Sequence, residues 1–451
     1  MIDLEFNMDR SIKNTTKNLL YRFKHFLRWL QPGLGVKRWL LIVFAGTTML
    51  AVGFALFVLD VYRRAPDTWW LPILSAVSLQ ALPRLLRVVI FSMLGVGTLG
   101  LGIYGLNRSL LGPFLRPGSP VVDKLEKHRS RRRGPKIVAI GGGHGLAALL
   151  RGLKEITNNL YAVVTVADDG GSSGRLRESL GILPPGDVRN CLAALSDDED
   201  LLTHLFQYRF ARANGSLEGH SFGNLFISAL VEVTGSFEKA IAESGRVLAV
   251  SGRVLPSTLE DVILKADIVR AEDGTTVRVV GESKIPETPG TISQVMLEPD
   301  KPAANPQAIQ AILSADLVVI GPGSLYTSIM PNLLVPDLTA ALRSTPALRL
   351  FISNVAAQKG ETEGFTSGDH LRVLEKQLGK NLFDIVVVNT QPPEQFNDQV
   401  QGIPVDPDLA RDYQVYEADL VDREYPWRHD SKELADVLVD LLAERTGPLT
   451  T

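Results

Sequence analysis

Cysteine is almost absent from this chain, which contains Cys191 and no other cysteine among its 451 residues. A disulfide within the chain is therefore excluded, and so is a zinc site built from cysteines. The remaining composition is that of an ordinary globular protein, with 45% hydrophobic and 22% charged residues. We expect two or three domains that work in a reducing compartment.

The C-terminal two thirds of the chain lacks an excess of positive charge. Residues 135–451 contain 27 Lys or Arg against 43 Asp or Glu, whereas residues 1–134 contain 20 against 7. Proteins that bind nucleic acid neutralise its phosphates with basic residues, so the acidic part is a poor nucleic-acid binder. We expect no nucleic acid among the partners of this protein.

Two long stretches without charge lie in the basic N-terminal part. Trp39–Leu59 has 21 residues and Val88–Leu106 has 19, each close to the ~20 needed to cross ~30 Å of hydrocarbon. Residues 1–38 and 107–134 each hold eight Lys or Arg, while the loop Asp60–Arg87 between the spans holds four. The positive-inside bias therefore predicts a two-pass anchor in the plasma (inner) membrane, with both termini and the acidic body on the cytoplasmic side.

Other interpretations of these spans stay open. The first span could belong to a cleaved signal peptide, although 38 residues precede it and no small-residue cleavage site is evident. The second span is rich in glycine, and small residues let membrane helices approach closely. That closeness favours two spans packed on each other, and a homodimer formed through the spans is the alternative.

The acidic body opens with a strand, a glycine-rich turn and a helix, in the sequence KIVAIGGGHGLAALLRGL of Lys136–Leu153. Val138–Ile140 is typical of a buried strand, and the leucines from Leu146 to Leu153 recur at the spacing of one helix face. Gly141–Gly145, which includes His144, lets a ligand approach the backbone, and the following helix N-terminus favours an anion such as phosphate. The dinucleotide fingerprint is incomplete because Leu146 replaces its last glycine. A purely structural turn is the alternative.

Strand-like and helical patterns alternate through the rest of the body. Such alternation predicts a parallel sheet covered by helices on both faces. A β-rich insertion is expected within Val247–Gly281, where Asp273–Gly274 is a hairpin signal. The expected strands of the main sheet are Lys136–Ile140, Tyr161–Ala167, Asp316–Ile320, Arg349–Ser353 and Asp384–Asn389. The expected parts of the chain are an N-terminal segment (1–38), a two-helix anchor (39–106), a basic linker (107–134) and an α/β domain (135–446).

Ligands of open α/β sheets bind beyond the carboxyl ends of the strands, where this chain has the loop ADDGGSSGRL of Ala167–Leu176. Asp168 follows the first glycine loop at about the sequence distance at which an acidic residue of a dinucleotide site hydrogen-bonds to a ribose hydroxyl. Asp169 could instead coordinate Mg²⁺, which takes carboxylates together with substrate phosphates. An Asp-Gly turn with capping carboxylates is the alternative.

Two further loops carry polar residues. In PPGDVRN, Asp187 could be a helix N-cap, and Arg189 could reach a phosphate. In GHSFGNL, His220 and Asn224 could contact a ligand or cap a helix. A serine nucleophile is not favoured there, because the G-x-S-x-G elbow is missing.

A second strand, glycine loop and helix start occur in VVIGPGSLYTSIM of Val318–Met330. Gly321, Gly323 and Ser324 offer backbone and hydroxyl donors to another anion. Two phosphate-type loops in one sheet suggest a diphosphate-bearing ligand, unless the second loop is only a structural turn.

Together these motifs resemble the gluconeogenesis factor family, the YvcK-like proteins, which share a superfamily with the CofD-like 2-phospho-L-lactate transferases. The resemblance rests on GGGHGL, VTVADDGGSSGRLR, PPGDVRN, GHSFGNL, GPGSLYTSIMPNLL and NVAAQKGETEGF. It implies a Rossmann-like doubly wound core, binding of UDP-sugars, and a role linking carbon metabolism to cell-wall growth and cell shape. It also implies that the first glycine loop and Asp168–Asp169 face the nucleotide, that Gly321–Tyr326 binds phosphates, and that Arg428 adds a charge contact.

This sequence departs from the family pattern in three respects. His144 stands where a threonine is usual, Lys359 replaces a proline, and the membrane-type front is absent from many relatives. His144 could change the affinity for the ligand or the choice of ligand.

The leading hypothesis is a membrane-tethered regulator that binds a nucleotide sugar. The alternative is a Mg²⁺-dependent transferase of the 2-phospho-L-lactate type, acting on a phosphorylated or nucleotide-diphosphate substrate, and a nicotinamide-dependent oxidoreductase is a weaker third. The expected ligand-binding residues are Gly141, Gly142, Gly143, His144, Gly145, Asp168, Asp169, Gly170, Gly171, Ser172, Ser173, Arg175, Asp187, Arg189, Asn190, His220, Asn224, Gly321, Gly323, Ser324, Tyr326, Asn354 and Arg428.

Overall fold

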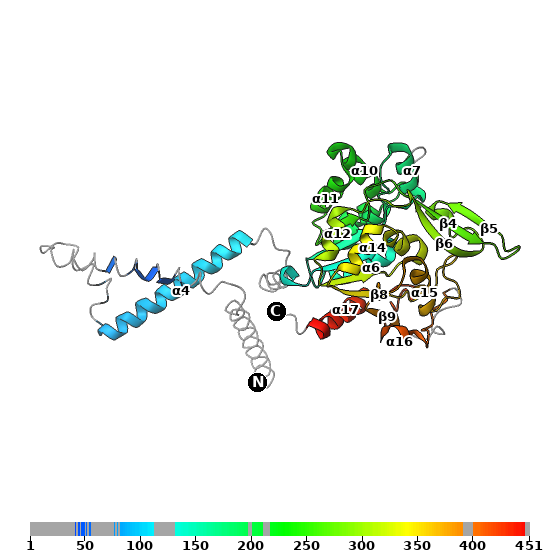
Figure 1. The fold of residues 1–451 in the computed structure, drawn as a ribbon. Helices are drawn as coiled ribbons and strands as arrows, with labels where there is room; N and C mark the ends of the chain where they lie inside the picture. The colour runs from blue at the N-terminus through cyan, green and yellow to red at the C-terminus, as the bar shows by residue number, and fades with distance from the viewer. Residues whose placement is uncertain are drawn as a thin grey trace, which may run out of the picture. The chain divides into compact units, whose positions relative to one another are not determined.

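The structure is a computed structural model with two compact units, Met1–Arg129 and Ser130–Thr451 (Figure 1). It describes residues 82–111, 131–196, 201–210, 217–390 and 400–446, together with scattered positions between 41 and 79.

The first unit contains the helix α4 (Arg84–Leu111), which includes the second expected span. Most of the first expected span, Trp39–Leu59, lies outside the described residues, as does most of the expected linker. A search of the described helices finds none with both the length and the apolar character that a membrane crossing requires.

The second unit is built on a seven-stranded sheet in the order β10-β9-β8-β7-β1-β2-β3, and all of its strand pairs are parallel. Read along the chain, the first six strands follow the doubly wound order 3-2-1-4-5-6. The predicted α/β fold with a mostly parallel sheet is therefore confirmed. The strands are β1 (Ile137–Gly141), β2 (Leu160–Val164), β3 (Arg253–Pro256), β7 (Leu317–Ile320), β8 (Leu348–Ile352), β9 (Ile385–Asn389) and β10 (Gln414–Ala418).

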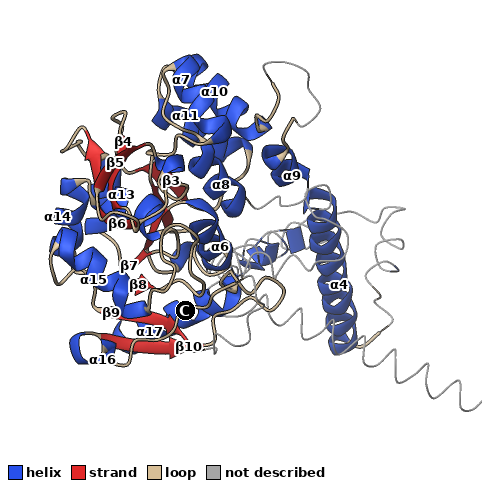
Figure 2. Cartoon of the chain, turned by 90° about the vertical axis from the view of Figure 1, so that its right-hand side faces the viewer, coloured by secondary structure: helices blue, strands red, loops and turns tan. Residues whose placement is uncertain are grey.

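Helices cover both faces of this sheet, with α14 and α15 on one side and α6 and α8 on the other (Figure 2). The expected helix face of α6 is buried from Leu146 to Leu153 and packs on α8 and α17. The helices are α6 (Gly143–Leu153), α7 (Gly171–Leu180), α8 (Gly186–Leu195), α9 (Leu201–Gln207), α10 (Phe222–Thr234), α11 (Phe237–Val247), α12 (Pro306–Leu313), α13 (Met330–Leu333), α14 (Pro336–Ser344), α15 (Ser367–Leu378), α16 (Leu409–Asp412) and α17 (Ser431–Thr446), with the short turns η2 (Glu282–Lys284) and η3 (Leu325–Ile329).

A separate three-stranded antiparallel sheet, in the order β5-β4-β6, forms the insertion. The predicted hairpin is confirmed as β4 (Ile263–Val269) paired with β5 (Thr276–Val280). The insertion extends beyond the predicted end at Gly281, because β6 (Thr291–Glu298) pairs with the other edge of β4. The buried side chains of β4 alternate along the strand, so one face of the small sheet packs on the body.

Two strands of the main sheet were not predicted. β3 has four residues and β10 is only partly buried, and both lie at the edges of the sheet. Neither has the continuous apolar run that identifies a central parallel strand, so pairing with a neighbour determines their structure.

Candidate functional site

A cavity of about 520 Å³ opens at the carboxyl ends of β1 and β7, where the strand order reverses. This is the position at which doubly wound sheets bind ligands. Of the residues expected at the site, those that line the cavity are Gly142, Gly143, His144, Gly145, Asp168, Asp187, Gly323, Ser324, Asn354 and Arg428.

The two glycine loops touch each other at the floor of the cavity. Gly145, in the first turn of α6, lies so close to the second loop that an added Cβ would sit 2.6 Å from the carbonyl oxygen of Pro322. Only glycine permits this approach without displacing the backbone. The two loops therefore pack directly against each other and form one continuous floor.

The N-terminus of α6 holds a carboxylate of the protein itself. Asp187, at the start of α8, accepts a hydrogen bond from the backbone N–H of Gly143. Burial, and to a lesser extent the charge of Asp168, raises the pKa of Asp187 to about 7. Asp187 thus occupies part of the anion position that the sequence assigned to a phosphate.

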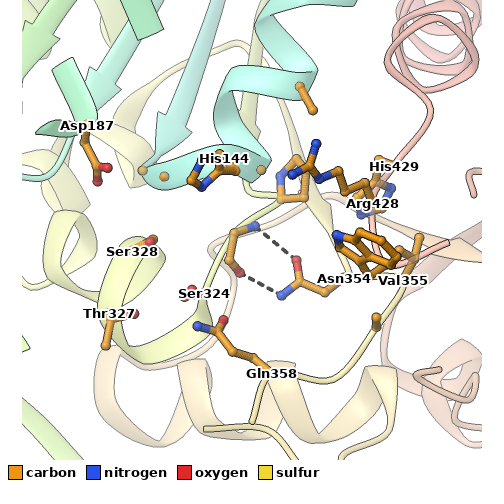
Figure 3. A pocket seen from close by; sticks show the side chains of 18 of the residues that line it. His144, Asp187, Ser324, Thr327, Ser328, Asn354, Val355, Gln358, Arg428 and His429 are labelled. Atoms are coloured by element: carbon orange, nitrogen blue, oxygen red, sulfur yellow. Dashed lines mark hydrogen bonds between the residues drawn. The ribbon is translucent and has the colours of Figure 1, made fainter. Parts of the chain in front are cut away.

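Side chains of the protein also accept hydrogen bonds from the backbone N–H groups of the second loop and the helical turn after it. Glu361 is buried and accepts hydrogen bonds from the backbone N–H of Tyr326 at 3.1 Å and from the hydroxyl of Thr327 at 2.8 Å. Asn354 closes the loop, because its side chain accepts from the N–H of Gly323 at 3.0 Å and donates to the carbonyl of Gly323 at 2.7 Å (Figure 3). The Tyr326 N–H is therefore engaged by Glu361, and the tyrosine side chain is buried.

Charge is divided between the two ends of the cavity. Carboxyl groups of Asp168, Asp187 and Glu282 line one end. Burial first, and the neighbouring carboxylates next, raise the pKa of Glu282 to about 8. The pKa of Asp168 is also raised by burial. At neutral pH this end can thus both donate and accept hydrogen bonds.

The opposite end is positive. In Figure 3, His144 lies between Asp187 on one side and Arg428 with His429 on the other. Partial burial lowers the pKa of His144, and nearby arginines lower it further, Arg428 first and Arg189 next. A cationic imidazole is disfavoured by this field, whereas a bound anion is favoured.

The sequence missed several residues that line the cavity. Ser328 follows the second glycine loop on its helix, so its position could have been inferred from VVIGPGSLYTSIM. Nothing in the sequence indicated that the insertion supplies Glu282. The same holds for His429, whose imidazole is buried with both ring nitrogens lacking a hydrogen-bond partner in the part of the chain that the structure describes. The missed residues include Thr165, Glu282, Pro286, Thr327, Ser328, Gln358, Trp427 and His429.

Several predicted residues form a buried network beside the cavity. The Asn224 amide donates to Ser172 Oγ at 3.1 Å, and Ser172 Oγ contacts His220 Nδ1 at 3.0 Å. Ser173 also lies within 3.5 Å of this amide and hydrogen-bonds to Asp168. This network holds Asp168 in place.

The other predicted residues also lie outside the cavity lining. Arg175 donates to the carbonyl of Glu218 at 2.7 Å, and the buried Arg189 donates to the side chain of Asn190 at 2.8 Å. The glycines Gly141, Gly170, Gly171 and Gly321 shape the backbone at the ends of β1, α7 and β7.

Asp169 is not part of the cavity lining and accepts a hydrogen bond from the N–H of Ser283 at 2.9 Å. Among the described residues there is no cluster of three or more His, Cys, Asp or Glu side chains placed to hold a metal ion. Mg²⁺ at Asp169 therefore stays a prediction, and this geometry does not favour it.

Comparison with known proteins places this architecture in a family. The family described as 2-phospho-L-lactate transferase CofD matches residues 137–437. A putative gluconeogenesis factor of Nostoc sp. is 48% identical over 379 residues, which are 83% of this chain and 81% of the relative. The gluconeogenesis factor of Bacillus subtilis is 45% identical over 325 residues, which are 69% of this chain and 99% of the relative.

A solved structure agrees with these matches. The crystal structure of a UPF0052 family member from Bacillus halodurans has a TM-score of 0.62 and 40% identity to this chain. It covers 68% of this chain and 99% of its own. The chain therefore belongs to the gluconeogenesis factor family of the CofD-like superfamily.

Proposed function

We propose that the cavity binds a nucleotide sugar, of which UDP-N-acetylglucosamine is the representative we would test first. The observation that carries this proposal is the division of charge within one cavity. The positive end, where Arg428 supplies the charge beside a neutral His144, suits a diphosphate. The carboxyl end suits the hydroxyl groups of a sugar, which hydrogen-bond to carboxyl oxygens.

The size and lining of the cavity support a ligand of this class. About 520 Å³ lies within the range of small-molecule sites. Trp427 lines the positive end and is 47% exposed, so its ring is available for stacking on a planar base. Gln358 faces the same cavity with an amide that can donate and accept.

In this proposal the protein is a regulator that couples carbon metabolism to cell-wall growth and cell shape. Family membership supports the link to gluconeogenic growth. A transferase acting on a nucleotide-diphosphate substrate is the competing function, and it predicts that the ligand is consumed.

Calorimetric titration of the full chain tests the proposal. We expect UDP-N-acetylglucosamine to bind without Mg²⁺ and more tightly than UDP or NAD. Arg428→Ala should weaken this binding about tenfold or more, because a charged hydrogen bond contributes about 1.5–3 kcal/mol. Arg423→Ala, which removes an exposed arginine of the same segment outside the cavity lining, should leave it unchanged. Absence of UDP-sugar binding would overturn the proposal, and Mg²⁺-dependent consumption of the ligand would favour the transferase.

We further propose that the N-terminal unit attaches the body to a membrane. The uncharged stretches of the sequence support this, as do the exposed apolar side chains of α4, among them Leu85, Met93 and Leu101. The B. subtilis relative matches over a length close to that of Ser130–Thr451 alone. A chain that begins at Ser130 should therefore fold and remain unbound in vesicle flotation, whereas the full chain should float. Equal behaviour of both chains would contradict the attachment.

A further inference from the structure

The turn at Gly281–Ser283 connects the small antiparallel sheet to the wall of the cavity. The N–H of Ser283 donates to Asp169 Oδ1 at 2.9 Å, and the N–H of Gly281 donates to the carbonyl of Leu264 in β4 at 2.9 Å. One side of the turn is therefore fixed to the insertion, and the other is fixed to the loop that follows β2.

Gly281 makes this attachment close. Its φ is +109°, and a Cβ added there would collide with the Asp169 carboxylate. A glycine with positive φ is thus required for the backbone to lie on Asp169. Asp169 supplies the anchor for the turn, although it does not itself line the cavity.

The residue between these two anchors is Glu282, and it does line the cavity. Within the described residues, its side chain receives no hydrogen bond and no ion pair. The charged groups that act on it are Asp168, Asp187, Asp169 and Glu361, and all four are acidic. Among the described residues no cation pairs with the Glu282 side chain, although Arg189 acts on the neighbouring Asp168 and Asp187. Its partner is therefore expected to come from a ligand that offers hydrogen-bonding hydroxyl groups rather than further negative charge.

The same cavity shows a second sign that a ligand completes it. His429 at the opposite end is 6% exposed, and neither ring nitrogen has a partner among the described residues. A buried polar group without a partner is costly, so such groups are usually satisfied by a ligand, ion or water.

We propose that Glu282 determines sugar specificity by hydrogen-bonding to a hydroxyl of the sugar moiety, and that Asp169 is a positioning residue that holds Glu282 in the cavity wall. This inference rests on the proposed function. It assigns to the insertion the selection of the sugar, while Arg428 and the opposite end of the cavity bind the part of the ligand common to all UDP-sugars.

The test is calorimetry of UDP-N-acetylglucosamine and of UDP, each with Mg²⁺ and with EDTA, on the full chain and its variants. Glu282→Ala should weaken binding of the UDP-sugar about tenfold and leave the affinity for UDP unchanged. Asp169→Ala should have the same selective effect, and the double variant should be no weaker than either single variant, because both act through one contact.

Asp169→Asn provides the rescue that separates positioning from charge or metal binding. Asparagine keeps an oxygen that accepts from the Ser283 N–H, so this variant should retain most of the UDP-sugar affinity. Glu287→Ala, at an exposed position of the same loop, is the matched control and should bind as the parent does.

The outcomes separate the two proposals. If the parent chain does not bind the UDP-sugar, the proposed function fails. Suppose that the parent binds the UDP-sugar and that Glu282→Ala prefers the UDP-sugar over UDP as strongly as the parent does. The assignment of sugar specificity to Glu282 is then wrong. It is equally overturned if Asp169→Asn is as weak as Asp169→Ala, or if the effect of Asp169 appears only with Mg²⁺. Should Asp169→Ala fail to fold, Glu282→Ala and Asp169→Asn still decide the question.

Discussion

Replacing Glu361 by alanine should destabilise the second unit by about 3 kcal/mol. The buried carboxylate accepts from the backbone N–H of Tyr326 and from the Thr327 hydroxyl. Without it, both donors are buried unsatisfied at the start of η3, and each such group costs about 1–3 kcal/mol. Urea unfolding followed by circular dichroism would measure the loss.

Two variants sharpen this prediction. Glu361→Gln keeps one acceptor oxygen and should recover part of the stability. Glu363→Ala removes an exposed glutamate two residues further on and should change stability by no more than about 0.5 kcal/mol. A Glu361→Ala protein as stable as the Glu363→Ala protein would show that the carboxylate does not support the second loop.

The second large effect is expected at the contact between the two glycine loops. Gly145→Ala places a methyl group against the Pro322 carbonyl, at a distance of 2.6 Å. The loops must separate to accept it, which should cost about 1–3 kcal/mol of stability. Because both loops form the cavity floor, ligand affinity should also fall by at least tenfold. Thermal unfolding and calorimetry would measure the two effects.

Gly323→Ala is the matched control on the facing loop. A Cβ at Gly323 would have its nearest neighbours at 3.5 Å, which is ordinary van der Waals contact. The stability of the Gly323→Ala protein should therefore stay close to that of the parent protein. If Gly145→Ala were equally harmless, the loops would be more adaptable than their close approach indicates.

The sequence was sufficient to predict the central sheet and the end of the sheet at which the candidate cavity opens. An apolar run such as Ile137–Gly141 is buried on both faces of a parallel sheet, so it can be recognised without knowledge of its neighbours. A glycine loop after such a strand identifies the carboxyl end of the sheet. The edge strands β3 and β10 were missed because their structure depends on the neighbours they pair with, and pairing partners cannot be recognised in a single short segment.

The site was harder to predict because its contacts join distant segments. Asp187 is 44 residues from Gly143, and Glu361 is 35 residues from Tyr326. These carboxylates nevertheless accept hydrogen bonds from backbone N–H groups at the two helix starts, so those groups are not available to a ligand. The spacing of glycines shows that an anion can bind at a helix start. It does not show whether that anion is a ligand phosphate or a carboxylate of the protein itself. Glu282 was missed for the same reason, since it enters the cavity from a separate sheet.

The protein's own carboxylates at the starts of α6 and η3 have a consequence for competition inside a cell. Nucleoside triphosphates are abundant and heavily charged, and an unguarded phosphate loop would bind them readily. Here the Tyr326 N–H already donates to Glu361, and Asp187 occupies the start of α6, so few backbone donors are left for an additional phosphate. The pocket should therefore discriminate against nucleoside triphosphates, so that its occupancy follows the supply of its own ligand rather than the pool of energy-carrying nucleotides.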